Sequence, residues 1–147
     1  LAFAAGLAAA AADTWATAVG AHSLSSPRHI LRGTVVPAGT SGGVTPLGTG
    51  GALVGAALVA VSALPLVGGR GAAEIILIGM GGMLLDSALG AGVQGRFLCD
   101  RCGLSSERRV HRCGQATRPV GGIRWLSNDG VNALASLAAT AAGWAAS

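Results

Sequence analysis

The sequence predicts an all-α membrane protein, a bundle of about four transmembrane helices, and three observations support that prediction. The chain of 147 residues is 51% hydrophobic and only 11% charged, whereas soluble domains are about one-quarter charged. Its 25 glycines and abundant alanines are typical of transmembrane helices, which approach one another closely where side chains are small. Four apolar segments also approach the roughly 20 residues that cross a bilayer.

The four apolar segments are separated by three polar connections. The segments are residues 1–20, 48–67, 73–97 and 126–146, and the connections are 21–47, 68–71 and 96–124. Because the first segment starts within apolar sequence, with no basic residues before it, it does not match a signal peptide. We therefore expect that the sequence lacks its natural N-terminus and further helices. Residues 1–147 are predicted to form a single membrane domain. Its expected partner is membrane lipid and not nucleic acid.

The distribution of arginine predicts the topology. All ten basic residues are arginine, with seven in 96–124, two in 21–47 and one in 68–71. The positive-inside rule then places both long connections in the cytoplasm, including the basic, Cys/His-containing loop 96–124. We expect a multi-pass protein of the plasma membrane.

The arginines have two possible roles. They would set this topology and contact anionic headgroups, or one of four arginines would clamp a substrate phosphate. Those four are Arg28, Arg32, Arg118 and Arg124.

Three lone carboxylates, Asp13, Asp86 and Asp129, each interrupt an apolar segment near one of its ends. A charge at the bilayer centre costs at least about 2.5 kcal/mol, and the predicted topology places all three near the cytoplasmic face. Carboxylates together with substrate phosphates are the usual ligands of Mg²⁺. The three acids are therefore predicted to share Mg²⁺ in a catalytic site, with Asn128 and Asn132 beside them. The alternative is a set of buried polar groups that link one helix to another.

A glycine-rich stretch, residues 36–45, is a candidate phosphate-binding loop. Glycine lets backbone N–H groups turn toward an anion, and hydroxyl groups add further donors. The stretch does not match the P-loop pattern, because no Gly-Lys-Ser/Thr follows, so a merely flexible loop is the alternative. The candidate phosphate-binding residues are Gly39, Thr40, Ser41, Gly42, Gly43 and Thr45.

A second metal-ligand pattern lies in the basic loop, where Cys99-x-x-Cys102 is followed by His111-x-Cys113. Thiolates and an imidazole suit tetrahedral Zn²⁺, and the two-residue gap lets one turn supply two ligands. Since all four ligands would come from the protein, this zinc would be structural, and it would organise a loop with few apolar residues. Free reduced thiols or an oxidised cysteine pair are the alternatives.

Four motifs that occur in order give a resemblance to a known family. They are Ala-Asp-Thr-Trp-Ala-Thr at 12–17, the loop 36–45, Asp-Ser-Ala-Leu-Gly-Ala at 86–91 and Asn-Asp-Gly-Val-Asn at 128–132. Together they resemble the family called domain of unknown function 92, which includes transmembrane protein 19 and the plant phytyl-phosphate kinase. The resemblance spans residues 6–137 and implies a multi-helix membrane protein. One difference is Ala18, which stands where the family usually carries an acidic residue.

The motifs and the resemblance together predict an integral membrane enzyme. The resemblance implies a kinase that phosphorylates a phytyl or prenyl monophosphate with a nucleoside triphosphate, and the three carboxylates add the expectation that it depends on Mg²⁺. A nucleotidyltransferase would use the same parts. An ion or anion transporter is the first alternative, because intramembrane carboxylates also mark ion pathways. A non-catalytic structural membrane protein is the second.

Overall fold

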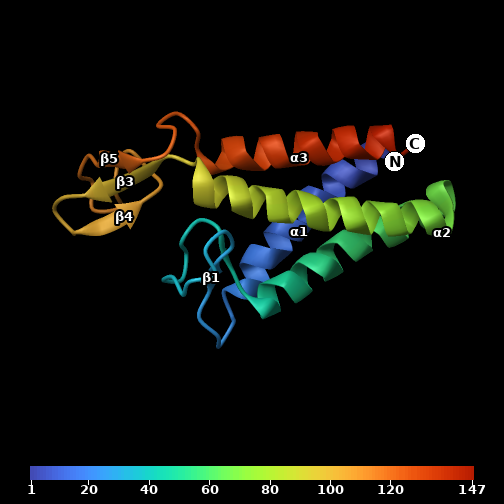
Figure 1. Ribbon diagram of the computed structural model, residues 1–147, viewed down its shortest axis with the longest axis horizontal. Coiled ribbons are helices and arrows are strands. Elements are labelled where there is room, and N and C mark those ends of the chain that lie inside the picture. The colour runs from blue at the N-terminus through green and yellow to red at the C-terminus, as the bar shows by residue number, and fades with distance from the viewer.

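The computed structural model describes residues 1–147 as three helices and two small antiparallel sheets (Figure 1). Helix α1 is Ala2–Gly20, α2 is Pro46–Gly92 and α3 is Asn128–Ala145. The helices lie together, and a three-stranded sheet projects beyond one end of them (Figure 1). Both chain termini lie at the opposite end, so the sheet and the termini are separated by the length of the helices.

Helix α2 reverses direction at Gly68. This residue has φ 69° and ψ 179°, outside the helical region, while the remainder of the 47-residue element is helical. Glycine adopts such a positive φ without the steric cost that a Cβ would add. The two limbs of α2 then run back along each other (Figure 1), and a Cβ on Gly79 would lie 3.3 Å from Cβ of Ala56.

The prediction of an all-α bundle with four transmembrane helices is wrong. The structure has three helices, of which α1 and α2 are long and apolar enough to cross a membrane. The predicted turn at 68–71 is replaced by a break at one residue, because helical structure continues on both sides of Gly68. The segment predicted to stay helical to residue 97 leaves the helix after Gly92. The sequence also contains strands that were not predicted.

Five short strands form the two sheets. They are β1 Arg28–His29, β2 Gly43–Val44, β3 Arg96–Cys99, β4 Leu104–Ser106 and β5 Arg118–Gly121. Strands β1 and β2 pair antiparallel, and the second sheet has the order β4-β3-β5. Strands of two to four residues are too short to show the apolar alternation that identifies a strand in a sequence. The β1–β2 pairing turns the connection after α1 back toward the helices, so the glycine-rich loop lies beside them.

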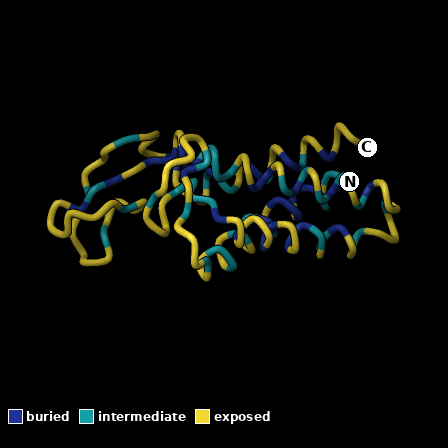
Figure 2. The backbone as a smooth tube through the Cα atoms, turned by 60° about the horizontal axis from the view of Figure 1, so that its bottom comes forward, coloured by how far each residue is buried: buried dark blue, intermediate teal, exposed yellow.

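Small residues form the core, and large apolar residues lie on the surface. Most buried apolar side chains are alanines, whereas Phe3, Leu66 and Trp144 are 81%, 90% and 78% exposed. Buried residues follow the inner sides of the helices, and exposed residues follow the outer sides and the sheet (Figure 2). This arrangement is expected where lipid, rather than water, surrounds the helices.

Glycines on the first limb of α2 bring α1 into direct contact with it. Gly48, Gly51 and Gly55 recur at three- and four-residue spacing and therefore share one face. A Cβ on Gly48 would lie 2.8 Å from the carbonyl oxygen of Ala16, and one on Gly55 would lie 2.8 Å from that of Ala11. The close approach fixes the position of α1 along the axis of α2, and therefore also the position of Asp13.

Candidate functional site

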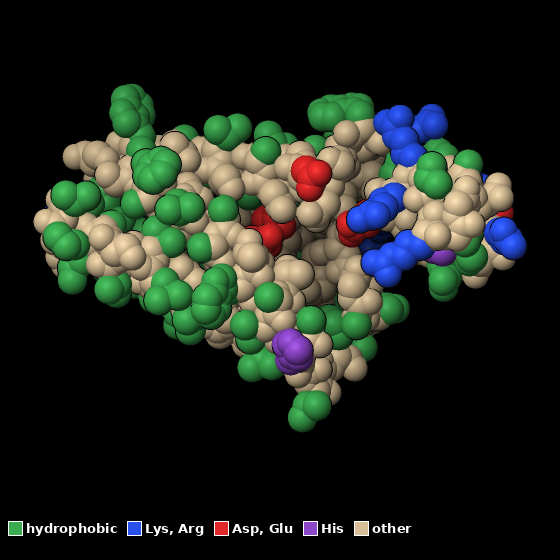
Figure 3. Space-filling model, turned by 180° about the vertical axis from the view of Figure 1, so that it is seen from behind, with side chains coloured by type: hydrophobic (Ala, Val, Ile, Leu, Met, Phe, Trp, Pro, Cys, Tyr) green, Lys and Arg blue, Asp and Glu red, His purple; other side chains and the backbone are tan.

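A cavity of about 470 Å³ lies between α1, both limbs of α2 and the glycine-rich loop. Three carboxylates line it, from Asp13, Asp86 and Glu107, and no arginine does. Figure 3 shows acidic side chains in a hollow at the middle of the molecule, with arginine side chains at its edge toward the sheet. The cavity wall is therefore acidic, and the positive charge lies outside it.

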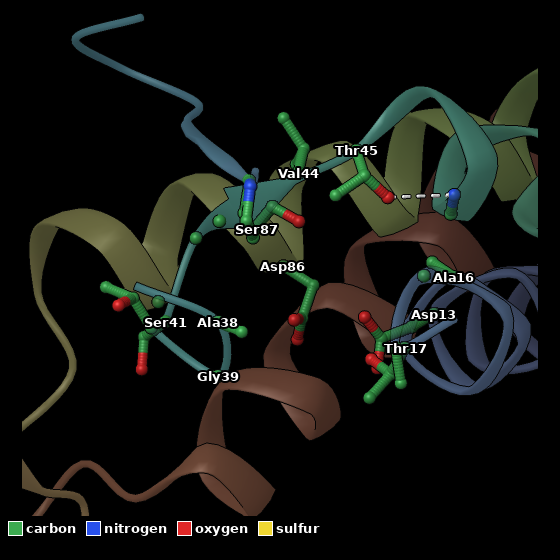
Figure 4. Close-up of a pocket in the computed structure, with 18 of the residues that line it drawn as sticks. Asp13, Ala16, Thr17, Ala38, Gly39, Ser41, Val44, Thr45, Asp86 and Ser87 are labelled. Atoms are coloured by element: carbon green, nitrogen blue, oxygen red, sulfur yellow. Dashed lines mark hydrogen bonds between the residues drawn. The ribbon is translucent and has the colours of Figure 1, made fainter. Parts of the chain in front are cut away.

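Asp13 and Asp86 are brought together by the crossing of α1 with the second limb of α2. A Cβ on Gly82 would lie 2.5 Å from Cβ of Ala9, so the two backbones are in contact there. Asp86 and Asp13 each follow this contact by four residues, one helical turn. Their carboxyl groups face each other in the cavity (Figure 4).

One oxygen of Asp86, Oδ1, is buried without a hydrogen-bond partner. A buried polar atom without a partner costs free energy, and a buried carboxylate needs a donor or a cation. A second cavity of about 80 Å³ adjoins the same acid pair and is also lined by Asn132 and Ser136 of α3. Oδ1 of Asn132 is likewise buried without a partner. Three oxygen-bearing side chains from three helical segments thus converge on one interior position.

Asp129 lies apart from the other two predicted ligands. It is in the first turn of α3, it is exposed, and it lines neither cavity. Its neighbour Asn128 lines the larger cavity, and Ser127 caps the helix by accepting from the N–H of Gly130 at 3.3 Å. The structure therefore brings together Asp13 and Asp86 but not Asp129, whose metal role stays a prediction. Ala18 is also exposed and outside both cavities.

The glycine-rich loop forms one wall of the larger cavity, and every predicted phosphate-binding residue lines it. Gly42, with φ 72°, lies against the second limb of α2, where a Cβ would lie 2.3 Å from Cβ of Ala91. The N–H groups of Gly39, Ser41 and Gly42 donate to no acceptor within the protein. The loop therefore offers unpaired donors on the wall that faces the acid pair, which is the chemistry that an anion requires.

Thr45 ends the loop and begins α2. Its hydroxyl oxygen accepts from the N–H of Gly48 at 3.0 Å (Figure 4), which satisfies one of the free donors of the first helical turn. Thr45, Gly48 and Thr49 all line the cavity, so the N-terminus of α2 faces it. The partial positive charge of a helix N-terminus favours an anion at this end of the cavity.

Glu107 and Gln94 are cavity residues that the sequence did not reveal. The carboxylate of Glu107 accepts a hydrogen bond from the hydroxyl of Ser41. Glu107 stands in a loop dominated by arginine, and nothing in its spacing marks it as different from a surface charge. Gln94 follows the end of α2, and its buried Nε2 atom has no partner. An amide at the end of an apolar segment was the signal that could have identified it.

Cys99, Cys102, His111 and Cys113 form a compact group at the sheet, hereafter the Cys/His cluster. Their ligand atoms all lie within 4.8 Å of one another. The Sγ atom of Cys113 is 3.7 Å from Sγ of Cys99 and 3.1 Å from Nδ1 of His111. The three cysteines form no disulfide. The hydrogen bond with His111 lowers the pKa of Cys113 to about 6, which favours the thiolate, the form that binds metal. The cluster could therefore bind a metal ion.

The arginines that were candidates for a phosphate clamp lie outside the cavity lining. Arg118 pairs with Asp100 across 2.7 Å, where both side chains are largely exposed. Arg28 donates from Nη1 to the carbonyl oxygen of Gly33 at 2.8 Å within its own loop. Arg118 therefore contacts the sheet and Arg28 contacts its own loop, and neither side chain lines the cavity.

The residues that line the cavity come from most of the chain, between Asp13 and Asn128. A match to a known family covers the same part of the chain. A family model described as "Integral membrane protein DUF92" matches residues 1–140. The chain belongs to this family of integral membrane proteins. The resemblance drawn from the four motifs is thereby confirmed, and the helices described above belong to a protein of the membrane.

One relative of this DUF92 protein is Protein PGR of Arabidopsis thaliana. The two are 31% identical over 133 residues, which cover 82% of this chain and 45% of PGR. The chain therefore spans less than half the length of that relative. No solved structure matches the chain.

Proposed function

We propose that this protein is a Mg²⁺-dependent kinase that transfers a phosphoryl group from a nucleoside triphosphate to a phytyl or prenyl monophosphate. One observation carries the proposal: Asp13 and Asp86 share a cavity with a glycine-rich loop that has unpaired N–H donors. Such a cavity offers ligands for a cation on one wall and donors for phosphate on another. Its volume, about 470 Å³, is in the range of small-molecule sites.

The charge of the cavity supports a metal ion as the link between protein and phosphate. Three carboxylates and no arginine line the wall, so a polyphosphate would be repelled unless a cation neutralised the acids. Mg²⁺ is usually held by one or two carboxylates together with substrate phosphates and waters. We assign to it the carboxylates of Asp13 and Asp86, the latter with its unpartnered Oδ1. Asn132 lies nearby in the smaller cavity.

The proposed reaction needs little from the protein beyond positioning and charge neutralisation. An oxygen of the lipid monophosphate attacks the γ-phosphorus, the bond from that phosphorus to the β-phosphate oxygen breaks, and the new P–O bond forms. The products are a nucleoside diphosphate and a lipid diphosphate. The attacking oxygen is already anionic, so no general base is required. The loop amides would stabilise the charge on the transferred group, and the prenyl tail would lie against the apolar outer faces of the helices.

We propose the cytoplasmic side of the plasma membrane as the location of the cavity. The glycine-rich loop and the three-stranded sheet lie at the same end of the helices (Figure 1). Nine of the ten arginines belong to the two segments at this end, which supports a cytoplasmic location by the positive-inside rule.

For the Cys/His cluster we propose structural Zn²⁺. Three thiols and one imidazole would complete a tetrahedral coordination shell without water, as in structural rather than catalytic zinc sites. Metal analysis of protein purified without chelator should find stoichiometric zinc. Replacement by Co²⁺ should give the visible absorption of a tetrahedral thiolate site. Zinc near zero, with no cobalt spectrum, would eliminate this assignment.

Ion transport is the second candidate, and the smaller cavity favours it. That cavity continues from the acid pair toward Ser136 in the interior of the helices, and a polar path at several depths is what a transported ion needs. Liposomes containing the protein would show Mg²⁺-dependent ion flux under this alternative. The kinase proposal requires no flux.

The deciding experiment is a transfer assay on purified full-length protein with γ-labelled nucleoside triphosphates and prenyl monophosphates of several lengths. We expect label in a lipid diphosphate, only with Mg²⁺, and loss of transfer in Asp86→Asn with folding intact. Glu74→Gln is a matched control, since Glu74 pairs with Arg70 close to the break at Gly68 and lines neither cavity. Transfer that is unchanged in Asp86→Asn would contradict the proposal.

A further inference from the structure

Glu107 joins the glycine-rich loop to the Cys/His cluster. Its carboxylate accepts a hydrogen bond from Ser41, and both residues line the larger cavity. Along the chain, Glu107 lies between two members of the cluster, Cys102 and His111. Whatever holds those two residues together also limits where Glu107 can lie.

The segment that carries Glu107 follows β4 and buries few side chains. Within residues 96–121, Phe97 and Cys99 are the buried residues, and a small sheet without a hydrophobic face is marginally stable. The base of the sheet is tied to the helices by two backbone hydrogen bonds, from Gly95 to Leu126 and from Ile123 to Val93, each under 3 Å. Residues 100–117 lie beyond these bonds. In that region β4 pairs with β3 up to Ser106, and Thr117 donates to the carbonyl oxygens of Arg108 and Arg109. The Cys/His cluster adds a contact between the turn that follows β3 and the segment that follows Glu107.

We infer that metal binding at the Cys/His cluster controls the cavity, because it holds Glu107 against Ser41 and so fixes the glycine-rich loop. Glu107 is a positioning residue in this account, acting through Ser41. The inference rests on the zinc site and the phosphate-binding loop proposed above. Loss of the metal would release residues 100–117, withdraw the carboxylate, and leave the loop without its contact to the sheet.

The loop contains reporters that do not depend on catalysis. The N–H groups of Thr40 and Gly43 donate to carbonyl oxygens within the loop, at 3.2 and 2.9 Å, and the N–H of Ile30 donates to Gly42 at 2.9 Å. Their hydrogen exchange measures how often the loop opens. We expect exchange at least about tenfold faster when the Glu107 contact is lost, as the loss of one charge-assisted hydrogen bond would give.

The experiment measures zinc content and loop exchange on the same full-length protein in detergent. Cys102→Ser should lose zinc and accelerate exchange at both 100–117 and 37–45. Glu107→Ala should keep its zinc and accelerate exchange only at 37–45, with Glu107→Gln restoring at least part of the protection. Ser41→Ala should match Glu107→Ala, and the double variant should add nothing further. Glu74→Ala is the matched acidic control and should change neither region.

Zinc removal from the folded wild-type protein by a chelator, followed by readdition, covers the case in which Cys102→Ser does not fold. Reversible acceleration at 37–45 supports the inference. Unchanged exchange at 37–45 after zinc loss overturns it, even where the zinc site itself is real. Wild-type protein without bound zinc also overturns it. Absence of kinase activity would overturn only the proposed reaction, because the exchange measurement does not use it.

Discussion

Gly82 lies directly against Ala9, and this contact sets the separation of the two carboxylates one turn further along. A Cβ on Gly82 would lie 2.5 Å from Cβ of Ala9, closer than real Cβ atoms approach. The residues four positions later are Asp86 on α2 and Asp13 on α1, which face each other in the cavity (Figure 4). A glycine without a catalytic group is thus part of the construction of the site.

The first prediction concerns this contact. Gly82→Ala should force α1 away from α2 and cost about 1–3 kcal/mol, as overpacking of a tight core does. Gly81→Ala is the matched control, because a Cβ there meets nothing within 4 Å and alanine is the better helix residue by about 0.5–1 kcal/mol. Thermal unfolding in detergent should rank Gly81→Ala at or above wild type and Gly82→Ala below it. Equal stability of the two variants would show that the contact is not tight.

The second prediction separates backbone strain from packing in the glycine-rich loop. Gly39 and Gly42 have φ 81° and 72°, so alanine at either position costs about 1–2 kcal/mol. Only Gly42 is also crowded, since a Cβ there would lie 2.6 Å from the carbonyl oxygen of Ser87. Gly42→Ala should therefore destabilise the protein more than Gly39→Ala and accelerate hydrogen exchange at 37–45. The reverse order would mean that the loop does not rest on α2.

The third prediction concerns the start of α2. Thr45→Ala removes the acceptor of the Gly48 N–H bond and should cost about 1 kcal/mol, the usual effect of losing an N-cap. Thr45→Ser keeps the hydroxyl and should stay close to wild type. Unfolding in denaturant measures both, and a serine variant as unstable as the alanine variant would assign the effect to the methyl group instead.

The fourth prediction concerns removal of metal from the Cys/His cluster. The segment between the first and last residues of the cluster carries several exposed arginines, namely Arg101, Arg108, Arg109 and Arg112. Zinc removal should free this segment and make trypsin cleave it faster, while cleavage after the exposed Arg70, which lies in α2 close to Gly68, serves as the internal control. Readdition of zinc should restore resistance. Cleavage at a constant rate with and without zinc would show that the sheet is stable without metal.

The sequence revealed the parts of the site that interrupt a strong pattern. Asp13 and Asp86 were identifiable because each breaks a long apolar segment, and the glycine-rich loop was identifiable because glycine and hydroxyl residues gather there. The membrane class followed from composition, and family membership confirms it. These signals are local, so they needed no knowledge of how the helices cross.

The features that the sequence did not reveal depend on contacts between distant segments. Glu107 looks like any charge in a basic loop until the sheet brings it to Ser41. Asp129 follows the same sequence logic as Asp86, yet the rotation of α3 leaves it exposed while Asn132, three residues later, lies by the acid pair. The break in α2 depends on one backbone angle at Gly68, where the sequence Gly-Gly-Arg-Gly equally fits a longer turn.

Binding of a divalent cation to the acid pair tests the central claim most directly. Mn²⁺ can replace Mg²⁺ as a paramagnetic probe, and its binding to the full-length protein can be titrated by electron paramagnetic resonance. We expect saturable binding in wild type and at least about tenfold weaker binding, or ~1.4 kcal/mol, in both Asp13→Asn and Asp86→Asn. Asp129→Asn is the matched carboxylate control, and its exposed position predicts little change. Binding that is equal in wild type, Asp13→Asn and Asp86→Asn would contradict the account.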